Sequence, residues 1–175
     1  SVGPFVLCPV HRSNLDFLIV GMAVPQRMRF MAKDSLWRPA SFGRFIEAIG
    51  AFPVDRSGAD RAAVRRAEEA VRGGEPLVMF PEGTRREGPE ITDMQRGPAL
   101  VACRSRVPIV PVGIGGSDRA MPIGAKMIRP AKVRVVIGEP IYPDVPLEGR
   151  VSRTVVAQTT EELRQSLQRL YDSVR

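Results

Sequence analysis

Short apolar runs that alternate with helical patterns constrain the fold of this chain more than any other feature of its sequence. The runs PFVLCPV (4–10), PLVMF (76–80) and PIVPVGI (108–114) contain no charged side chain. Continuous apolar runs of this length are typical of strands that are covered on both faces. Helical patterns separate them, so the sequence predicts an α/β fold: a twisted, mixed or mostly parallel sheet flanked by helices.

The whole chain, residues 1–175, is predicted to form a single domain. Apolar residues at helical spacing predict a long C-terminal helix over 152–174. Pro53 permits only an edge or irregular strand, because proline cannot donate to a central ladder. No apolar run approaches the ~20 residues of a membrane-spanning helix. The chain enters its first strand almost at once, so we expect an N-terminal segment to be missing.

The charge balance predicts an anionic partner. The chain has 26 Lys and Arg against 19 Asp and Glu, a net charge of +7, and a pI of about 10.4. Nucleic acid, a phospholipid surface and a phosphorylated metabolite all fit this charge. Aromatic residues make up only 6%, and no recognition-helix or stacking motif is present. These two features argue against nucleic acid.

Cysteine and histidine usage limits the chemistry. Cys8 and Cys103 lie in apolar surroundings without a spacing pattern. They predict a reduced, cytosolic protein rather than a disulfide scaffold. His11 is the only histidine, so a zinc site with nitrogen and sulfur ligands is not expected, and we predict no metal.

His11 and Asp16 lie five residues apart where the first strand gives way to a helix. In one interpretation Ser13 is the N-cap of this helix in an S-x-x-D pattern, and the Asp16 carboxylate satisfies backbone amides. In the other, the chain reverses between His11 and Asp16. The carboxylate then fixes the tautomer of an imidazole that acts as a general base. No G-x-S-x-G nucleophile is present, so such a base would activate a substrate hydroxyl directly.

The stretch FPEGTRREG (80–88) follows another buried strand. Gly83 permits a tight turn. An oxyanion would be bound there by the backbone amides of the turn together with the Thr84 hydroxyl and the Arg85 guanidinium. Glu82 would either orient an arginine or bind a substrate hydroxyl. Lys33 and Arg56 also follow strands, so cations from three strand ends could meet at one anion; the alternative is an ordinary turn with solvated cations.

Four motifs in order resemble those of the glycerolipid acyltransferases, most closely the bacterial 1-acylglycerol-3-phosphate acyltransferases. They are H-x4-D (11–16), GAFPVDR (50–56), FPEGTR (80–85) and VPIVPV (107–112). Each is weak alone, but four in order are specific. The resemblance extends over roughly residues 5–143. The sequence departs from the family pattern at Val10, where Asn is usual, at Ser35, where Glu is usual, and at Arg96, where Lys is common.

The resemblance implies transfer of an acyl chain from acyl-CoA or acyl-acyl-carrier protein to the free hydroxyl of 1-acylglycerol 3-phosphate, without an acyl-enzyme and without a cofactor. His11 would be the base and Asp16 its orienting partner. The acceptor and its phosphate would be bound by residues of the other motifs: Lys33, Arg56, Glu82, Gly83, Thr84 and Arg85. An amide near Gly83 could also stabilise the thioester oxyanion. The missing N-terminal segment would be membrane-binding.

Several alternatives remain open at this level. The acceptor could be glycerol 3-phosphate, lysophosphatidylglycerol or a lysophosphoinositide, or water could replace it in a hydrolase. A non-catalytic basic membrane-binding module is a different class. We expect an anionic membrane surface as partner, and a place at the cytoplasmic face of the cell membrane, peripheral or anchored by a segment outside this chain. Basic residues that fit this expectation, or are simply solvated, are Arg61, Arg65, Arg119, Lys126 and Arg129.

Overall fold

The computed structural model describes residues 3–24, 26–54, 61–146 and 149–175. The elements are β1 (Val6–Pro9), α1 (Asp16–Ala23), β2 (Arg29–Lys33), the 3₁₀ helix η1 (Asp34–Trp37), α2 (Ala40–Ala48), β3 (Ala51–Val54), α3 (Arg61–Arg72), β4 (Leu77–Val78), α4 (Gly97–Ser105), β5 (Ile109–Gly115), α5 (Ser117–Ala120), β6 (Arg134–Ile137) and α6 (Arg153–Val174).

Within the described residues, one six-stranded sheet has the order β3-β2-β4-β1-β5-β6. Strands β1 to β5 pair in parallel, and β6 pairs antiparallel with β5. The predicted α/β fold with a mixed, mostly parallel sheet is confirmed. Strand β3, which contains Pro53, lies at the edge of the sheet as predicted, where a missing N–H costs no ladder hydrogen bond.

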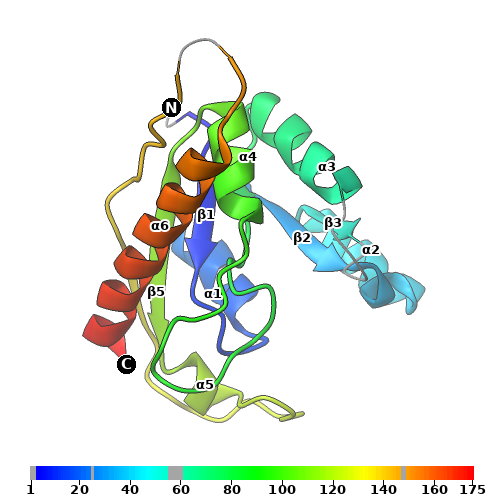
Figure 1. Cartoon of the computed structure of the whole chain (residues 1–175). Coiled ribbons are helices and arrows are strands. Elements are labelled where there is room, and N and C mark those ends of the chain that lie inside the picture. Colours follow the sequence, from blue (N-terminus) through cyan, green and yellow to red (C-terminus); the bar gives the residue numbers. More distant parts are fainter. Residues whose placement is uncertain (1–2, 25, 55–60, 147–148) are drawn as a thin grey trace.

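Helices cover both faces of the sheet, and β1 shows how the core is divided. Val6 and Cys8 pack in a cluster with buried residues of α3, α4 and α6. Phe5 and Leu7, the alternate residues, pack in a second cluster with residues of α1 and α2. Side chains on a strand alternate between its faces, so the all-apolar β1 is buried on both sides. Figure 1 shows α4 and α6 in front of β1 and β5, and α1 behind them.

Helix α6 lies along β5 and confirms the predicted C-terminal helix. Ser152 caps it by accepting a hydrogen bond from the Val155 amide over 3.1 Å. A Cβ on Gly113 would lie 2.8 Å from the backbone of Leu170, so glycine in β5 permits this close approach. No helix among the described residues is long and apolar enough to cross a bilayer.

Strand β4 is shorter than the sequence pattern predicts. The apolar run 76–80 yields only Leu77–Val78 as strand. The chain turns directly afterwards, because the Gly83 amide donates to the Phe80 carbonyl over 3.0 Å. This turn lies within residues 80–85 and sets the direction of the chain that carries Thr84 and Arg85.

The carboxyl ends of the parallel strands meet at one edge of the sheet. His11 follows β1, Lys33 ends β2, Val54 ends β3, and the FPEGTR motif (80–85) begins two residues after β4. Three of the four sequence motifs therefore begin or end at the same edge, where parallel α/β sheets usually bind ligands.

Candidate active site

His11 and Asp16 form a direct side-chain pair at this edge. The Nδ1 atom of His11 lies 3.0 Å from Oδ2 of Asp16. Asp16 is fully buried, whereas the imidazole remains partly exposed. With the proton on Nδ1, the imidazole donates to the carboxylate, and its Nε2 carries the free lone pair. This arrangement orients a base and can stabilise an imidazolium.

The same carboxylate oxygen also holds the backbone. Asp16 Oδ2 accepts hydrogen bonds from the amides of Arg12 and Ser13, each over 2.7 Å. The two interpretations of Asp16 therefore do not exclude one another. One oxygen builds the turn between β1 and α1, and this turn brings His11 within reach.

The predicted capping role of Ser13 is wrong in its details. Helix α1 begins at Asp16 with Leu15 at the N-cap and no side-chain cap. Ser13 is fully buried, and its hydroxyl accepts from the Leu15 amide over 3.2 Å and donates to the Met121 carbonyl over 2.8 Å. The tight turn around Asp16 delays the helix, so Ser13 stabilises the turn and links it to the chain after α5.

A buried ion pair between Arg12 and Glu82 binds the backbone of His11. Arg12 is 3% exposed and Glu82 is 1% exposed. Nη1 of Arg12 donates to both Glu82 oxygens over 2.7 and 2.8 Å. Glu82 Oε2 accepts from the His11 amide over 3.0 Å, and Arg12 Nη1 donates to the His11 carbonyl over 3.1 Å. Both peptide groups of His11 are thus fixed by one ion pair.

These contacts bear on the two roles that the sequence left open for Glu82, to orient an arginine or to bind a substrate hydroxyl. Both of its oxygens are used by protein donors, and the side chain does not line the cavity described below. The geometry therefore favours the orientation of an arginine. That arginine is Arg12, which the sequence interpretation did not single out. Its guanidinium also lies over the Tyr171 ring, 4.9 Å from the centroid.

The Phe80 ring packs against one face of the His11 imidazole. The two rings stack with centroids 4.1 Å apart and an interplanar angle of 30°. Sequence reasoning assigned Phe80 only to a strand. Its place directly before the PEGTR residues was the one available signal, and only the turn after β4 puts it against His11.

The loop after β4 carries an exposed Thr84 and a partly buried Arg85. Gly83 has a φ of 69°, in the left-handed region that favours glycine, and its own amide closes the turn onto Phe80. Arg85 and Thr84 line the same cavity as His11. Arg86 turns away: its amide donates to the His11 carbonyl over 3.0 Å, and its guanidinium pairs with Asp93 over 3.2 Å.

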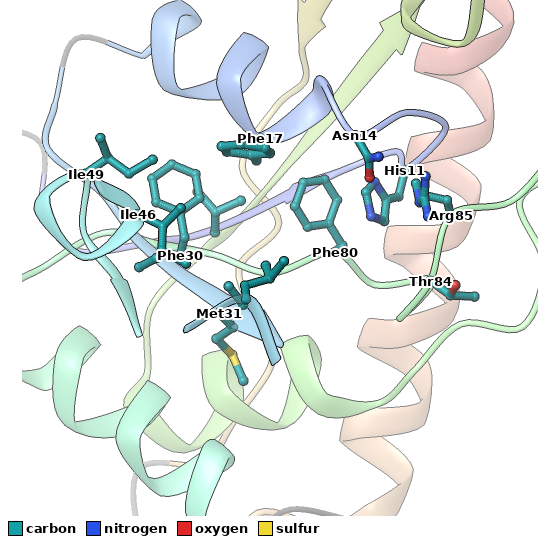
Figure 2. A pocket seen from close by; sticks show the side chains of 14 residues that line it. His11, Asn14, Phe17, Phe30, Met31, Ile46, Ile49, Phe80, Thr84 and Arg85 are labelled. Carbon is teal, nitrogen blue, oxygen red and sulfur yellow. The ribbon is translucent and has the colours of Figure 1, made fainter. Parts of the chain in front are cut away.

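A cavity of about 420 Å³ extends from His11 between the sheet and the helices α1 and α2. Figure 2 shows its two ends: His11, Asn14 and Arg85 gather at one, and Ile46 and Ile49 lie at the other. The apolar part is lined by side chains from α1, α2, η1 and the sheet: Phe17, Phe30, Met31, Ala32, Leu36, Ile46, Ile49, Ala51, Val78 and Phe80. Such a shape suits a long apolar group whose polar end lies at the imidazole.

The structure does not describe the side chains of two predicted phosphate ligands, Lys33 and Arg56. Lys33 is the last residue of β2 and pairs with Val54 in the ladder; the structure describes its backbone only. Arg56 lies outside the described residues. The convergence of these cations with Arg85 therefore stays a prediction, although the strand ends that carry them share one edge.

Metal ligands and nucleophiles are scarce in this region. Among the residues that the structure describes, no three His, Cys, Asp or Glu side chains are placed to share a metal ion. Cys8 is fully buried in β1, and burial raises the pKa of its thiol far above the usual range. A buried, protonated thiol is a poor nucleophile, so His11 has no activated cysteine beside it.

Comparison with known proteins identifies the family. The family model described as Acyltransferase matches residues 1–115 of the 175 in the chain. The chain belongs to this acyltransferase family. A likeness in fold agrees: the crystal structure of the 1-acyl-sn-glycerophosphate acyltransferase of Thermotoga maritima superposes with a TM-score of 0.79 at 24% identity. The matched region covers 99% of this chain and 67% of the Thermotoga maritima chain.

Curated relatives within the acyltransferase family differ in how much of their length is shared. The 1-acyl-sn-glycerol-3-phosphate acyltransferase of Bacillus subtilis is 28% identical over 167 residues, which are 95% of this chain and 80% of the relative. The chloroplastic 1-acyl-sn-glycerol-3-phosphate acyltransferase of Brassica napus is 28% identical over 79% of this chain. This chain spans only 41% of that plant relative.

Proposed function

We propose that this chain transfers an acyl group from an acyl thioester to the free hydroxyl of 1-acylglycerol 3-phosphate, making phosphatidate. The observation that carries the proposal is the His11–Asp16 pair, 3.0 Å apart, at the polar end of a long apolar cavity that Arg85 also lines. The names of the relatives support the choice of acceptor. Neither metal nor cofactor takes part in the proposed reaction.

In the proposed mechanism His11 Nε2 removes the proton of the acceptor hydroxyl while the oxygen attacks the thioester carbonyl. The tetrahedral intermediate then expels the thiolate, which takes the proton from the imidazolium. Asp16 stabilises the imidazolium between these two steps, a role typically worth several powers of ten in rate. Because the acceptor attacks directly, no acyl-enzyme forms. A backbone amide of the 83–85 turn would donate a hydrogen bond to the oxyanion. The Gly83 amide is not this donor, because it already donates to the Phe80 carbonyl.

The phosphate of the acceptor would bind to the cations of the motif loops. Arg85 offers a forked donor beside His11, and the Thr84 hydroxyl follows the same turn. Lys33 and Arg56 complete this set by the family resemblance. Arg12 and Glu82 act below the site as positioning residues, because they fix the peptide groups on both sides of the imidazole.

The apolar cavity would receive an acyl chain, since its lining beyond Phe80 is apolar as far as Ile49. The donor would be acyl-CoA or acyl-acyl-carrier protein. Lysolipid acceptors reside in membranes, so the protein would work at an anionic membrane surface, at the cytoplasmic face. The net charge of +7 supports this placement.

The test is an assay of the purified protein with radiolabelled 1-acylglycerol 3-phosphate and acyl-CoA. Wild type should form phosphatidate, and His11→Ala should lower kcat by about 10²–10⁴-fold. Arg85→Ala should mainly raise KM for the acceptor, because it removes uniform binding. Arg169→Ala, an exposed arginine on α6, is the matched control and should behave as wild type.

Different products separate the competing functions. Glycerol 3-phosphate, lysophosphatidylglycerol and lysophosphoinositide serve as competing acceptors in the same assay. Release of free fatty acid without acceptor would indicate a hydrolase. A wild-type protein that forms no acylated product with any acceptor, yet binds vesicles, would leave only the non-catalytic membrane module.

A further inference from the structure

A loop between α5 and β6 exposes large apolar side chains to solvent. Met127 is 78% exposed and Ile128 is 65% exposed, and the two are adjacent in sequence. Ile123 is exposed in the same loop. Two large apolar neighbours at the tip of a loop have no part in the core, and the site described above does not use them.

Basic residues surround this apolar tip. Lys126 and Arg129 directly flank Met127 and Ile128. The whole stretch 119–138 contains no Asp or Glu, and its basic residues are Arg119, Lys126, Arg129, Lys132 and Arg134. Apolar side chains between cations are the combination that suits the interface of an anionic bilayer, where acyl chains and phosphates lie within a few ångströms of each other.

The loop is ordered by its own hydrogen bonds. The Arg129 amide donates to the Ala120 carbonyl over 2.8 Å, which closes the loop at its base. Within it, the Ala125 amide donates to the Pro122 carbonyl over 3.0 Å. The tip is therefore held out from the body of the protein by a defined backbone.

The base of the loop touches the turn that carries the His11–Asp16 pair. The buried Ser13 hydroxyl donates to the Met121 carbonyl over 2.8 Å. Strands β1 and β5 run parallel as neighbours, so the chain leaves both at the same edge of the sheet. Figure 1 shows α5 and the following loop beyond the ends of β1 and β5. The tip thus projects on the side of the molecule where the proposed acceptor would enter.

We propose that residues 121–129 form a lipid-docking loop, which inserts Met127 and Ile128 into an anionic membrane and binds phosphates through Lys126 and Arg129. The loop would seat the His11 edge of the sheet against the bilayer that holds the lysolipid. This inference rests on the proposed function and deepens it by naming the surface that meets the membrane. Vesicle binding needs no turnover, so it can be tested separately from the acyltransferase activity.

The experiment measures cosedimentation with vesicles of phosphatidylcholine alone and of phosphatidylcholine with phosphatidylglycerol, without substrates. Wild type should bind the anionic vesicles preferentially. Met127→Ser/Ile128→Ser should weaken binding by about tenfold or more, because both apolar anchors are lost. Lys126→Gln/Arg129→Gln should weaken it by about fivefold for each charge, and the effect should vanish on phosphatidylcholine.

Matched controls lie near the amino-terminal end of β5, away from the His11 side of the sheet. Tyr142 is 73% exposed and follows Ile141, which bridges Ile109 at the start of β5. Tyr142→Ser removes an equally exposed apolar side chain, and Arg150→Gln/Arg153→Gln removes two exposed charges near the start of α6. Both should bind vesicles within about twofold of wild type if the loop provides the docking contact.

A probe on the tip provides a second readout. Cys8 and Cys103 are both buried, so Met127→Cys can be labelled selectively with an environment-sensitive dye. Its emission should shift to the blue on anionic vesicles, whereas a dye on Tyr142→Cys should not shift. Unchanged vesicle binding by Met127→Ser/Ile128→Ser, or an unshifted dye at position 127, would overturn the proposal.

Activity measurements on the same loop variants separate a lipid partner from a protein partner. If the variants bind vesicles as wild type but lose activity only with acyl-acyl-carrier protein, the loop binds an acidic protein and the lipid proposal fails. If they lose vesicle binding yet retain turnover of a short-chain, water-soluble acceptor, the proposal holds. A wild type that binds through the loop but acylates no acceptor would reject the proposed function and leave the docking loop standing.

Discussion

Removing one partner of the Arg12–Glu82 ion pair should strongly destabilise the protein. Both side chains are almost completely buried, and their closest atoms lie 2.7 Å apart. Glu82→Leu leaves the guanidinium without its counter-charge, and Arg12→Met leaves the carboxylate without its own. An unpaired buried charge typically costs about 3–5 kcal/mol, a large part of a domain stability of about 5–15 kcal/mol.

The double variant Arg12→Met/Glu82→Leu should cost much less than the sum of the two single variants. It removes both charges together, so no buried charge remains unpaired. What remains is chiefly the orphaned His11 amide, worth about 1–3 kcal/mol. The expected loss for the double variant is therefore comparable to that of one single variant or smaller.

Urea unfolding followed by circular dichroism measures these differences. With a slope of about 2 kcal/mol per molar urea, each single variant should lower the midpoint by about 1.5–2.5 M. Glu162→Gln, which removes an exposed carboxylate on α6, is the control and should leave the midpoint unchanged. Additive losses in the double variant, or single losses below about 1 kcal/mol, would refute the reasoning that the two charges depend on each other.

Three further predictions concern packing, titration and thiol chemistry. Gly113→Ala should lower the free energy of unfolding by about 1–3 kcal/mol, because the new Cβ would meet the α6 backbone at 2.8 Å. Gly21→Ala, in α1 with its nearest contact at 3.8 Å, should raise it by about 0.5–1 kcal/mol in the same denaturation assay. Hydrogen bonds from Arg164 lower the pKa of Glu161 from 4.5 to about 2; the stability they add is complete above pH 4.5 and lost as the pH falls through 2. Carboxyl ¹³C NMR should record this low pKa in wild type and a return toward 4.5 in Arg164→Met. The Cys8 thiol should react with a disulfide reagent only after denaturation, and rapid reaction in the native protein would contradict its burial.

Local patterns made much of the fold predictable from sequence. The apolar runs at 4–10 and 108–114 became β1 and β5, because a strand covered on both faces must be apolar at every position. Pro53 favoured an edge position for β3, where its missing N–H costs no ladder hydrogen bond. The run at 76–80 became a two-residue strand, followed by a turn in which the Gly83 amide donates to the Phe80 carbonyl. Hydropathy does not record where a turn begins.

The sequence by itself determined the chemistry that is available: one imidazole, a carboxylate five residues away, and cations at strand ends. Only the tertiary structure decided which groups meet. Glu82 pairs with Arg12 across 70 residues because β4 lies beside β1 in parallel register. Phe80 reaches the imidazole, and Met121 reaches Ser13, for the same reason: neighbouring strands deliver their following loops to one edge. Periodicity reports whether a side chain is buried, but its partner depends on the order and register of the strands, which no local pattern contains.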